Sequence, residues 1–346
     1  MPNFVASNFV KAQAIINERF NTPELRMRPS PIIQLGVRNS SILLPDHVQL
    51  RTREDRPIEA YIIKRNKRDT TGKKRTHDHT GTFGDSMNVP INFVSFVDTF
   101  RISQKWMDNN MYALENVLAN QFMQAFQNIR DDIEVYLGDM LLSQKTQVNT
   151  ATRNGAWNPA NHAFEIAAPS LERGLLFEDA KSMMRQNGYV GDYDVVADPK
   201  LFRDAQFYAN QGGGNAANLQ FQFSGMNIAE STTISDAEYS NGIALFLPSN
   251  SFGLLDWIPL QNRKGNGDYN TYNGGWGSMR DPISGWEFAV HGYSQRANTA
   301  SNNGNEQDLA TEFEISIDIS ANLAPLSTAT ETVVYQVAQV SKIETD

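Results

Sequence analysis

The sequence contains no cysteine, and only five of its 346 residues are histidine. The absence of cysteine excludes disulfides, thiolate metal sites and cysteine nucleophiles, so any assembly must be held by surface contacts or by cross-links without sulfur. The sequence also lacks a run of about eighteen apolar residues, and no apolar run follows a basic segment near its start. We therefore expect a soluble protein made in the cytoplasm, without a membrane partner.

Familiar catalytic and cofactor motifs are missing too. The sequence has no His-Glu-x-x-His pattern and no Gly-x-Ser-x-Gly turn, and the Gly-rich segments 212–217 and 265–270 lack the other residues of a phosphate or dinucleotide loop. The triplet His77-Asp78-His79 could bind a metal, but a flexible loop is the favoured interpretation. No acid–base pair stands out. We predict no catalytic residue, no cofactor and no metal site.

Positive charge is scarce overall and gathered in one segment. The formal net charge is −9, which argues against a protein that coats nucleic acid, because neutralising phosphates requires a basic face. Between Arg51 and Arg75, ten basic residues accompany four acidic ones, which leaves the rest of the chain at −15. We predict that this segment docks onto a negative patch of an identical neighbour; the alternative is a solvated loop without a partner. The candidate contact residues are Lys64, Arg65, Lys67, Arg68, Lys73, Lys74 and Arg75.

The strongest pattern is a helical stripe from Trp106 to Leu141, in which apolar residues recur three or four positions apart. Such a helix would span roughly 50 Å, which is longer than a small domain is wide. The intervals follow no strict seven-residue repeat, which disfavours a coiled coil. We predict one strut along a flat or elongated subunit. Its apolar positions are Met107, Met111, Leu114, Leu118, Phe122, Phe126, Ile129, Ile133, Leu137 and Leu141.

The segment before this helix predicts an arm and a protruding ribbon. Residues 8–20 have helical spacing and are followed by a proline-rich stretch, which favours an arm that reaches over a neighbour rather than the start of a compact core. Strand-like patterns at 48–53, 58–63 and 89–97 flank a polar tip at 65–85. A structureless loop of this length is suspect inside a compact domain, so we expect the tip to protrude.

The segment after the helix predicts an α+β mixture with mostly antiparallel strands. A polar stretch up to Pro169 marks a boundary, and 263–279 is interpreted as a loop. We predict helices at 171–184, capped by Gly188, and at 199–208, opened by Asp198-Pro199. Strands are expected at 193–197, 219–223, 226–229, 243–247, 287–293, 311–319 and 332–340.

An aromatic cluster near the end of this region has two interpretations. The residues could form a platform for sugars, or they could be a packed corner between strands, which we favour. They are Trp257, Trp276, Trp286, Tyr269, Tyr272 and Tyr293.

The order of arm, basic hairpin, long helix, α+β region and closing strands resembles the major capsid proteins of tailed bacteriophages, the Hong Kong ninety-seven fold, over essentially the whole chain. Three segments look like those of the axial domain in that family: Tyr193-Asp-Val-Val-Ala-Asp-Pro199, Phe221-Gln-Phe-Ser-Gly-Met-Asn-Ile-Ala-Glu230 and Ile243-Ala-Leu-Phe-Leu-Pro248. Two others look like late strands that return to the peripheral domain: Gly285-Trp-Glu-Phe-Ala-Val-His-Gly-Tyr293 and Glu312-Phe-Glu-Ile-Ser-Ile-Asp318. No single motif is diagnostic, so the specificity lies in their order.

The resemblance implies a division of the chain. It gives an N-terminal arm at 1–47, the extended hairpin or E-loop at 48–98, a peripheral domain with the spine helix at 99–169, an axial domain at 170–284, and closing strands of the peripheral domain with a C-terminal strand at 285–346. The long acidic extension that provides scaffolding in some members is not seen before the arm. We therefore expect a separate scaffolding protein or an independent assembly trigger.

The resemblance also implies a function. It predicts a structural protein, not an enzyme, that forms the pentamers and hexamers of an icosahedral phage head, assembled in the host cytoplasm. Its partners would be copies of itself, scaffolding and portal proteins, possible decoration proteins, and packaged double-stranded DNA that it does not bind specifically. The alternatives are the shell protein of an encapsulin-like nanocompartment and, less favoured, a carbohydrate-binding or carbohydrate-acting protein.

Overall fold

A computed structural model describes residues 4–19, 30–44, 46–63, 86–103, 114–145, 156–167, 176–186, 188–211, 225–263, 274–297, 308–324 and 333–341. The helices are α1 (Phe4–Arg19), α2 (Pro31–Leu43), α3 (His47–Thr52), α5 (Leu114–Ser143), α6 (Leu176–Gln186), α7 (Pro199–Gln211) and α9 (Leu260–Arg263). The strands are β1 (Glu59–Ile63), β2 (Ser86–Pro90), β3 (Val94–Ser103), β4 (Ala156–Asn158), β5 (Ala163–Ala167), β6 (Tyr193–Ala197), β7 (Met226–Glu230), β8 (Ile243–Pro248), β9 (Phe252–Trp257), β10 (Gly274–Arg280), β11 (Glu287–Ala297), β12 (Asp308–Leu323) and β13 (Tyr335–Val340).

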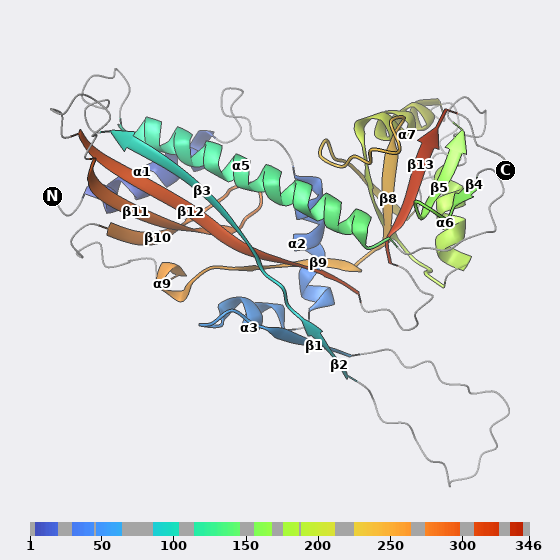
Figure 1. The fold of residues 1–346 in the computed structure, drawn as a ribbon, viewed down its shortest axis with the longest axis horizontal. Helices are drawn as coiled ribbons and strands as arrows, with labels where there is room; N and C mark the ends of the chain where they lie inside the picture. Colours follow the sequence, from blue (N-terminus) through green and yellow to red (C-terminus); the bar gives the residue numbers. More distant parts are fainter. Residues whose placement is uncertain are drawn as a thin grey trace, which may run out of the picture.

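Two large sheets lie at opposite ends of an elongated molecule, and α5 runs from one to the other (Figure 1). The five-stranded sheet has the order β10-β11-β12-β3, with β9 paired to the far end of β12. The six-stranded sheet has the order β4-β5-β13-β8-β6-β7, in which only the β13–β5 and β6–β7 pairs are parallel. The α+β fold with mostly antiparallel strands is therefore confirmed.

The long helix is confirmed as α5, which is continuous from Leu114 to Ser143 and passes through Gly138. Met107 and Met111 lie outside the described residues. From Leu118 onward every predicted apolar position is buried, because one side of the helix lies on the five-stranded sheet. Phe126 stacks on Phe288 of β11 with ring centroids 5.0 Å apart.

The first helix corrects our interpretation of the N-terminal segment. In α1, Ala12 and Ile16 are fully buried in the same core cluster as α5, and Lys11 pairs with Glu115 at 3.0 Å. The expectation that this helix stands apart from the core was wrong. An amphipathic helix must cover its apolar face, and here α5 of the same chain provides the surface.

Helix α2 was not predicted, because we interpreted Pro31, its first residue, as part of a proline-rich arm. Pro31 in fact occupies the first turn, where a missing backbone N–H costs nothing. The buried residues have helical spacing: Ile32, Ile33, Leu35, Gly36, Asn39, Ser40 and Leu43. This spacing was the signal that could have identified the helix.

Two other short segments differ from the prediction. Residues 47–52 form α3 rather than a strand, and Leu50 is their only buried residue, so six residues offered no periodicity to separate the two structures. The predicted strand 89–97 is two strands, β2 and β3, separated at 91–93. The break follows Pro90, which has no N–H to continue a ladder.

Most elements of the second half are confirmed. Strand β6 has the predicted bounds and is buried throughout, and α7 begins at Pro199, where Asp198 accepts a hydrogen bond from the N–H of Leu201 at 2.8 Å. Gly188, with φ of 86°, ends α6 as predicted. Strands β7, β8, β11, β12 and β13 include most of their predicted ranges. The predictions for 171–175 and 219–223 lie outside the described residues.

Four strands were missed. Residues 274–279 were interpreted as loop but form β10, whose pairing with β11 overrides the weak strand preference of its glycines. Strands β4, β5 and β9 were not predicted. Segment 156–167 and β13 belong to the six-stranded sheet, whereas β9 and β10 belong to the five-stranded sheet.

One apolar cluster joins the two sheets into a single body. It contains Phe288 and Ile315 of the five-stranded sheet, the buried face of α5, and Val196 and Leu245 of the six-stranded sheet. A second cluster fills the space between the other face of the six-stranded sheet and helices α6 and α7. The packed core is continuous from one large sheet to the other, so the two sheets and α5 form one body of low compressibility. We call this body, the two large sheets with α5, the plate.

Candidate assembly site at the hairpin root

The seven predicted contact residues, Lys64, Arg65, Lys67, Arg68, Lys73, Lys74 and Arg75, lie outside the described residues, as does the predicted tip as far as residue 85. The structure does describe where this segment begins and ends. Strands β1 and β2 pair antiparallel from Glu59 opposite Pro90 to Ile63 opposite Ser86, which confirms the predicted ribbon at its base. Figure 1 shows the two strands at the edge of the molecule, below β9 and pointing away from both sheets.

The chain just before the ribbon, residues 51–58, is fixed to the plate by two ion pairs. We call residues 51–58 with β1 and β2 the hairpin root. Arg51 Nη2 lies 2.6 Å from Oδ2 of Asp256 in β9, and Arg56 Nη2 lies 2.8 Å from Oδ2 of Asp318 in β12. Asp256 and Asp318 are both buried, so each arginine neutralises a carboxylate that would otherwise be costly to bury.

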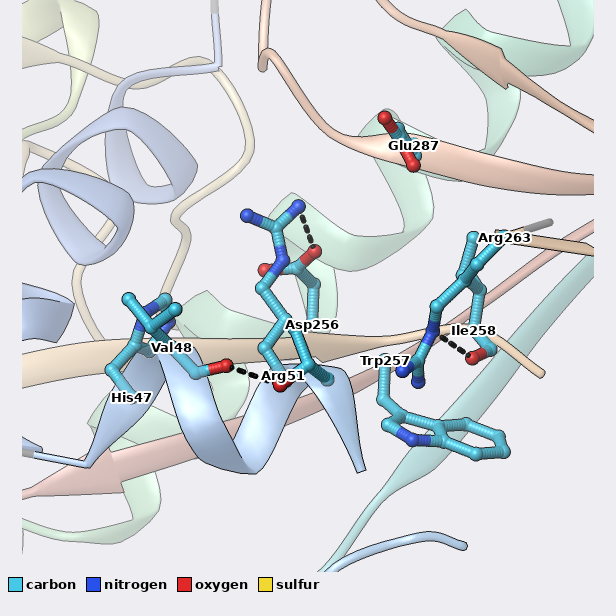
Figure 2. A pocket seen from close by; sticks show the side chains of 9 residues that line it. His47, Val48, Arg51, Asp256, Trp257, Ile258, Arg263 and Glu287 are labelled. Atoms are coloured by element: carbon cyan, nitrogen blue, oxygen red, sulfur yellow. Dashed lines mark hydrogen bonds and ion pairs between the residues drawn. The ribbon is translucent and has the colours of Figure 1, made fainter. Parts of the chain in front are cut away.

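Trp257 holds the same segment through its ring and its N–H. Its indole Nε1 donates to the carbonyl of Arg53 at 3.1 Å. The guanidinium groups of Arg56 and Arg263 lie 5.7 and 5.3 Å from the ring centroid, within the range of a cation–π interaction. Figure 2 shows Arg263 beside Trp257, where its Nε donates to the carbonyl of Ile258 at 2.8 Å.

A pocket of about 280 Å³ lies between α3, β9, α9 and β11 (Figure 2). Burial raises the pKa of Asp256 although Arg51 and His47 oppose the shift, and burial lowers the pKa of His47. Of the charged groups that line the pocket, Arg51 and Asp256 form an ion pair. Glu287 is the other carboxylate of the lining, and it is exposed. The Arg51–Asp256 pair at the wall of this pocket joins the hairpin root to β9.

A small apolar cluster completes the anchorage. It consists of Leu44, Leu50, Ala60, Ile91 and Leu255, with Val89 and Phe93 at its margin. Beside it, large apolar side chains are left in solvent: Val48 is 71%, Ile58 79% and Tyr61 61% exposed. Exposed apolar side chains gathered around a rigid element are typical of a surface that another protein covers.

The aromatic cluster is packed where the structure describes it. Trp257 is 7% and Trp286 3% exposed, so neither offers a flat face to a sugar. The side chains of Trp276 and Tyr293, and residues Tyr269 and Tyr272, lie outside the described part. This result favours the packed corner.

Within the described ranges, no group of three or more His, Asp or Glu side chains is placed to hold a metal ion. The His77-Asp78-His79 triplet falls outside them. None of the helices in the described part is long and apolar enough to cross a membrane.

No protein-family model and no curated protein matches the sequence. Solved structures do match. A chain from Mycobacterium phage Adephagia is 13% identical, and the match covers 97% of this chain and 98% of that chain with a TM-score of 0.50. A chain from Mycobacterium phage Bobi is 12% identical over 93% and 94% of the two chains, with a TM-score of 0.49. A chain described as the capsid of a native GTA particle is 10% identical over 81% and 84%, with a TM-score of 0.46.

The match to the Adephagia chain covers nearly the full length of both proteins. The chain has the Hong Kong ninety-seven capsid fold.

Sequence reasoning predicted the ribbon but missed the residues that hold its root. Asp256, Trp257 and Asp318 come from strands at least two hundred residues after Arg51 and Arg56. The only local signal was an acid beside a tryptophan in an otherwise apolar strand, and this does not reveal a partner.

Proposed function

We propose that this protein is the major capsid protein of a bacteriophage, which self-assembles into pentamers and hexamers and closes as an icosahedral shell around double-stranded DNA in the virion. The observation that carries the proposal is the capsid fold itself, matched over almost the whole chain. The protein acts as a structural component and not as an enzyme, and it needs no cofactor.

The shape of the subunit supports this role. A closed shell needs plates that keep their form while neighbours meet at slightly different angles. The continuous core across both sheets gives such a plate, and α5 stiffens it, since the helix is packed on the five-stranded sheet at one end. At the other end Lys145, just after the helix, pairs with Asp236 at 3.3 Å beside the six-stranded sheet.

The charge distribution supports docking between copies. We propose that the basic segment, with Lys64, Arg65, Lys67, Arg68, Lys73, Lys74 and Arg75, contacts an acidic surface of the neighbouring subunit. The remainder of the chain carries the excess of negative charge, and opposite charges both steer and select such a contact. The basic segment continues from the anchored hairpin root, whose exposed apolar side chains add contact area.

The acidic body also suits a container for DNA. Dense DNA inside a shell should not adhere to the wall, and a net charge of −9 disfavours binding to phosphate. The DNA is therefore cargo rather than a specific ligand. Separate scaffolding and portal proteins, and possible decoration proteins, complete the proposed set of partners.

The domain division stays a proposal, and the sheets suggest a refinement of it. We place the axial domain in the six-stranded sheet with α6 and α7, which adds segment 156–167 and β13 to the predicted 170–284. The peripheral domain then includes α5 and the five-stranded sheet, with β9 and β10. In this division α1 and α2 of segment 1–47 pack on the peripheral domain.

A nanocompartment shell is the alternative with the same architecture, and it differs in its contents. Particles should be purified from cells that carry the complete set of neighbouring genes. Nuclease first digests any DNA outside the particles, and the particles are then opened to identify their contents. Protected double-stranded DNA supports a phage head. A single enriched enzyme without protected DNA would support the nanocompartment and contradict our proposal.

A further inference from the structure

The pocket beside the hairpin root carries no net charge, and we call it the root pocket. Its lining contains two arginines, Arg51 and Arg263, and two acids, Asp256 and Glu287 (Figure 2). Burial lowers the pKa of His47, the remaining titratable group of the lining, so its ring is neutral at pH 7. A neutral pocket favours an uncharged occupant, because a charged side chain would enter it without a free counter-charge.

Apolar side chains form much of the wall of the root pocket. Val48 of α3 is 71% exposed and stands at its open side. Ile258 and Trp257 belong to the same wall and are buried. The volume is about 280 Å³, at the lower limit of pockets that hold small molecules, which suits one large apolar side chain.

One polar atom of the lining has no partner. Arg263 donates through Nε to the carbonyl of Ile258 at 2.8 Å and through Nη1 to the carbonyl of Arg53 at 3.0 Å. Its Nη2 is buried and has no hydrogen-bond partner among the described residues. A buried donor without an acceptor costs free energy. A backbone carbonyl that arrives with an apolar side chain would provide the acceptor and bring no charge.

The segment between the two strands of the ribbon contains a single apolar residue. Within 64–85, all other residues are charged, polar or glycine, and Phe83 alone has a large apolar side chain. It precedes Ser86, the first residue of β2, by three positions, so the chain keeps it within about 10 Å of the end of the ribbon. Figure 1 shows β1 and β2 leading away from α9 and β11, beside which the root pocket lies. The partner of Phe83 is therefore sought on a second copy.

We propose that Phe83 of one copy occupies the root pocket of a second copy. The phenyl ring lies against Val48 and Ile258, and a backbone carbonyl next to the ring accepts a hydrogen bond from Nη2 of Arg263. Glu287 is exposed beside the pocket and offers its carboxylate to the basic residues of the same segment. This inference rests on the proposed function, because it names the seat of one contact between copies.

A disulfide between two copies tests the contact, because the chain has no cysteine of its own. Chains with Thr82→Cys, which keeps Phe83, are mixed and oxidised with chains that carry Val48→Cys and a tag that changes their mass. We expect a dimer of mixed mass on a non-reducing gel. The matched control uses Val190→Cys in place of Val48→Cys, since Val190 is 84% exposed but lies outside the pocket. The control mixture should lose the mixed dimer.

Removing the anchor tests the same contact without a cross-link. Phe83→Ser should raise the protein concentration needed for association by about thirtyfold, as the loss of a buried aromatic anchor commonly does. Phe83→Leu should keep most of the association, because it keeps an apolar side chain. Light scattering over a dilution series measures this concentration, and circular dichroism shows whether each variant is folded.

Three results would overturn the contact. One is an equal yield of mixed dimer with Val48→Cys and with Val190→Cys. Another is association of Phe83→Ser at the same concentration as the unmodified chain. The third is a disulfide in the double variant Thr82→Cys with Val48→Cys that forms only within one chain, which would place Phe83 in its own pocket.

Two further outcomes are separable from these. If Phe83→Ser does not fold, the yield of mixed dimer decides between the contact and its absence. If the unmodified chain does not associate at all, the proposed function is contradicted, and this contact with it. Association that survives Phe83→Ser contradicts the contact alone.

Discussion

Arg38 of α2 and Asp194 of β6 form an ion pair, with Nη2 of Arg38 2.6 Å from Oδ1 of Asp194. The carboxylate is fully buried and also accepts hydrogen bonds from Asn39 and Asn227, each at 3.1 Å. One strand residue of the six-stranded sheet thus gathers three donors, two of them from α2. This contact joins the six-stranded sheet to the helix that also lies against β9 and α5.

Replacing Asp194 should therefore weaken the whole plate. We expect Asp194→Ala to lower the free energy of unfolding by about 2–4 kcal/mol, because it leaves buried amide donors without an acceptor. Urea unfolding of the unassembled chain measures this. Asp192→Ala, two residues earlier and exposed, should change stability by less than about 0.5 kcal/mol. Equal changes in the free energy of unfolding for the two variants would show that Asp194 does not join the six-stranded sheet to α2.

Gly36 is required by close packing and not by backbone conformation. A Cβ there would lie 2.4 Å from Cγ of Leu254 and 2.9 Å from Cε1 of Phe252, both buried. We expect Gly36→Ala to destabilise the chain by about 1–3 kcal/mol, although alanine favours a helix by about 1 kcal/mol. The exposed Ser41→Ala in the same helix is the control. A rise in melting temperature for Gly36→Ala would contradict the close contact of residue 36 with Leu254 and Phe252.

The hairpin root should depend on the Arg51–Asp256 pair in a pH-dependent way. Removing Arg51 leaves a buried carboxylate whose pKa burial already raises, so its pKa should rise further. The folded state then binds a proton more readily than the unfolded chain, and stability falls as the pH increases above the ordinary range of Asp. We expect Arg51→Ala to cost about 1–2 kcal/mol at pH 7 and less at pH 4.5. An equal loss in the free energy of unfolding at pH 7 and at pH 4.5 would argue against the Arg51–Asp256 pair as the anchor.

Charge reversal in the basic segment tests the docking proposal. The triple variant Arg65→Glu, Lys67→Glu and Arg68→Glu should abolish shells and leave a folded monomer, because the contact becomes repulsive. The matched control exchanges the same residues without changing charge: Arg65→Lys, Lys67→Arg and Arg68→Lys. Electron microscopy shows whether shells form, and circular dichroism shows whether the variant is folded. Normal shells from the reversed variant would contradict docking by this segment.

The parts of the fold predicted from sequence are those with a strong local signal. The apolar stripe of α5 repeats over many turns, and Asp198-Pro199 gives α7 both a cap and a fixed first turn. Strand β6 is a short buried run with turn residues on both sides. In each case the local preference and the tertiary environment agree.

The missed parts depend on contacts between distant segments. Strand β10 contains three glycines and is stabilised by its pairing with β11. Helix α3 is too short for periodicity, and its position is decided by Leu50 packing under the ribbon. The partners of the hairpin root, Asp256 and Asp318, are brought there by strand order alone. Neither periodicity nor spacing contains that information.

Shell formation by this chain is tested by expressing it alone and combining size-exclusion chromatography with electron microscopy of the fractions. We expect closed shells, capsomers or tubes in the early-eluting fractions. A clean monomer, even when the neighbouring gene products are present, would contradict this expectation.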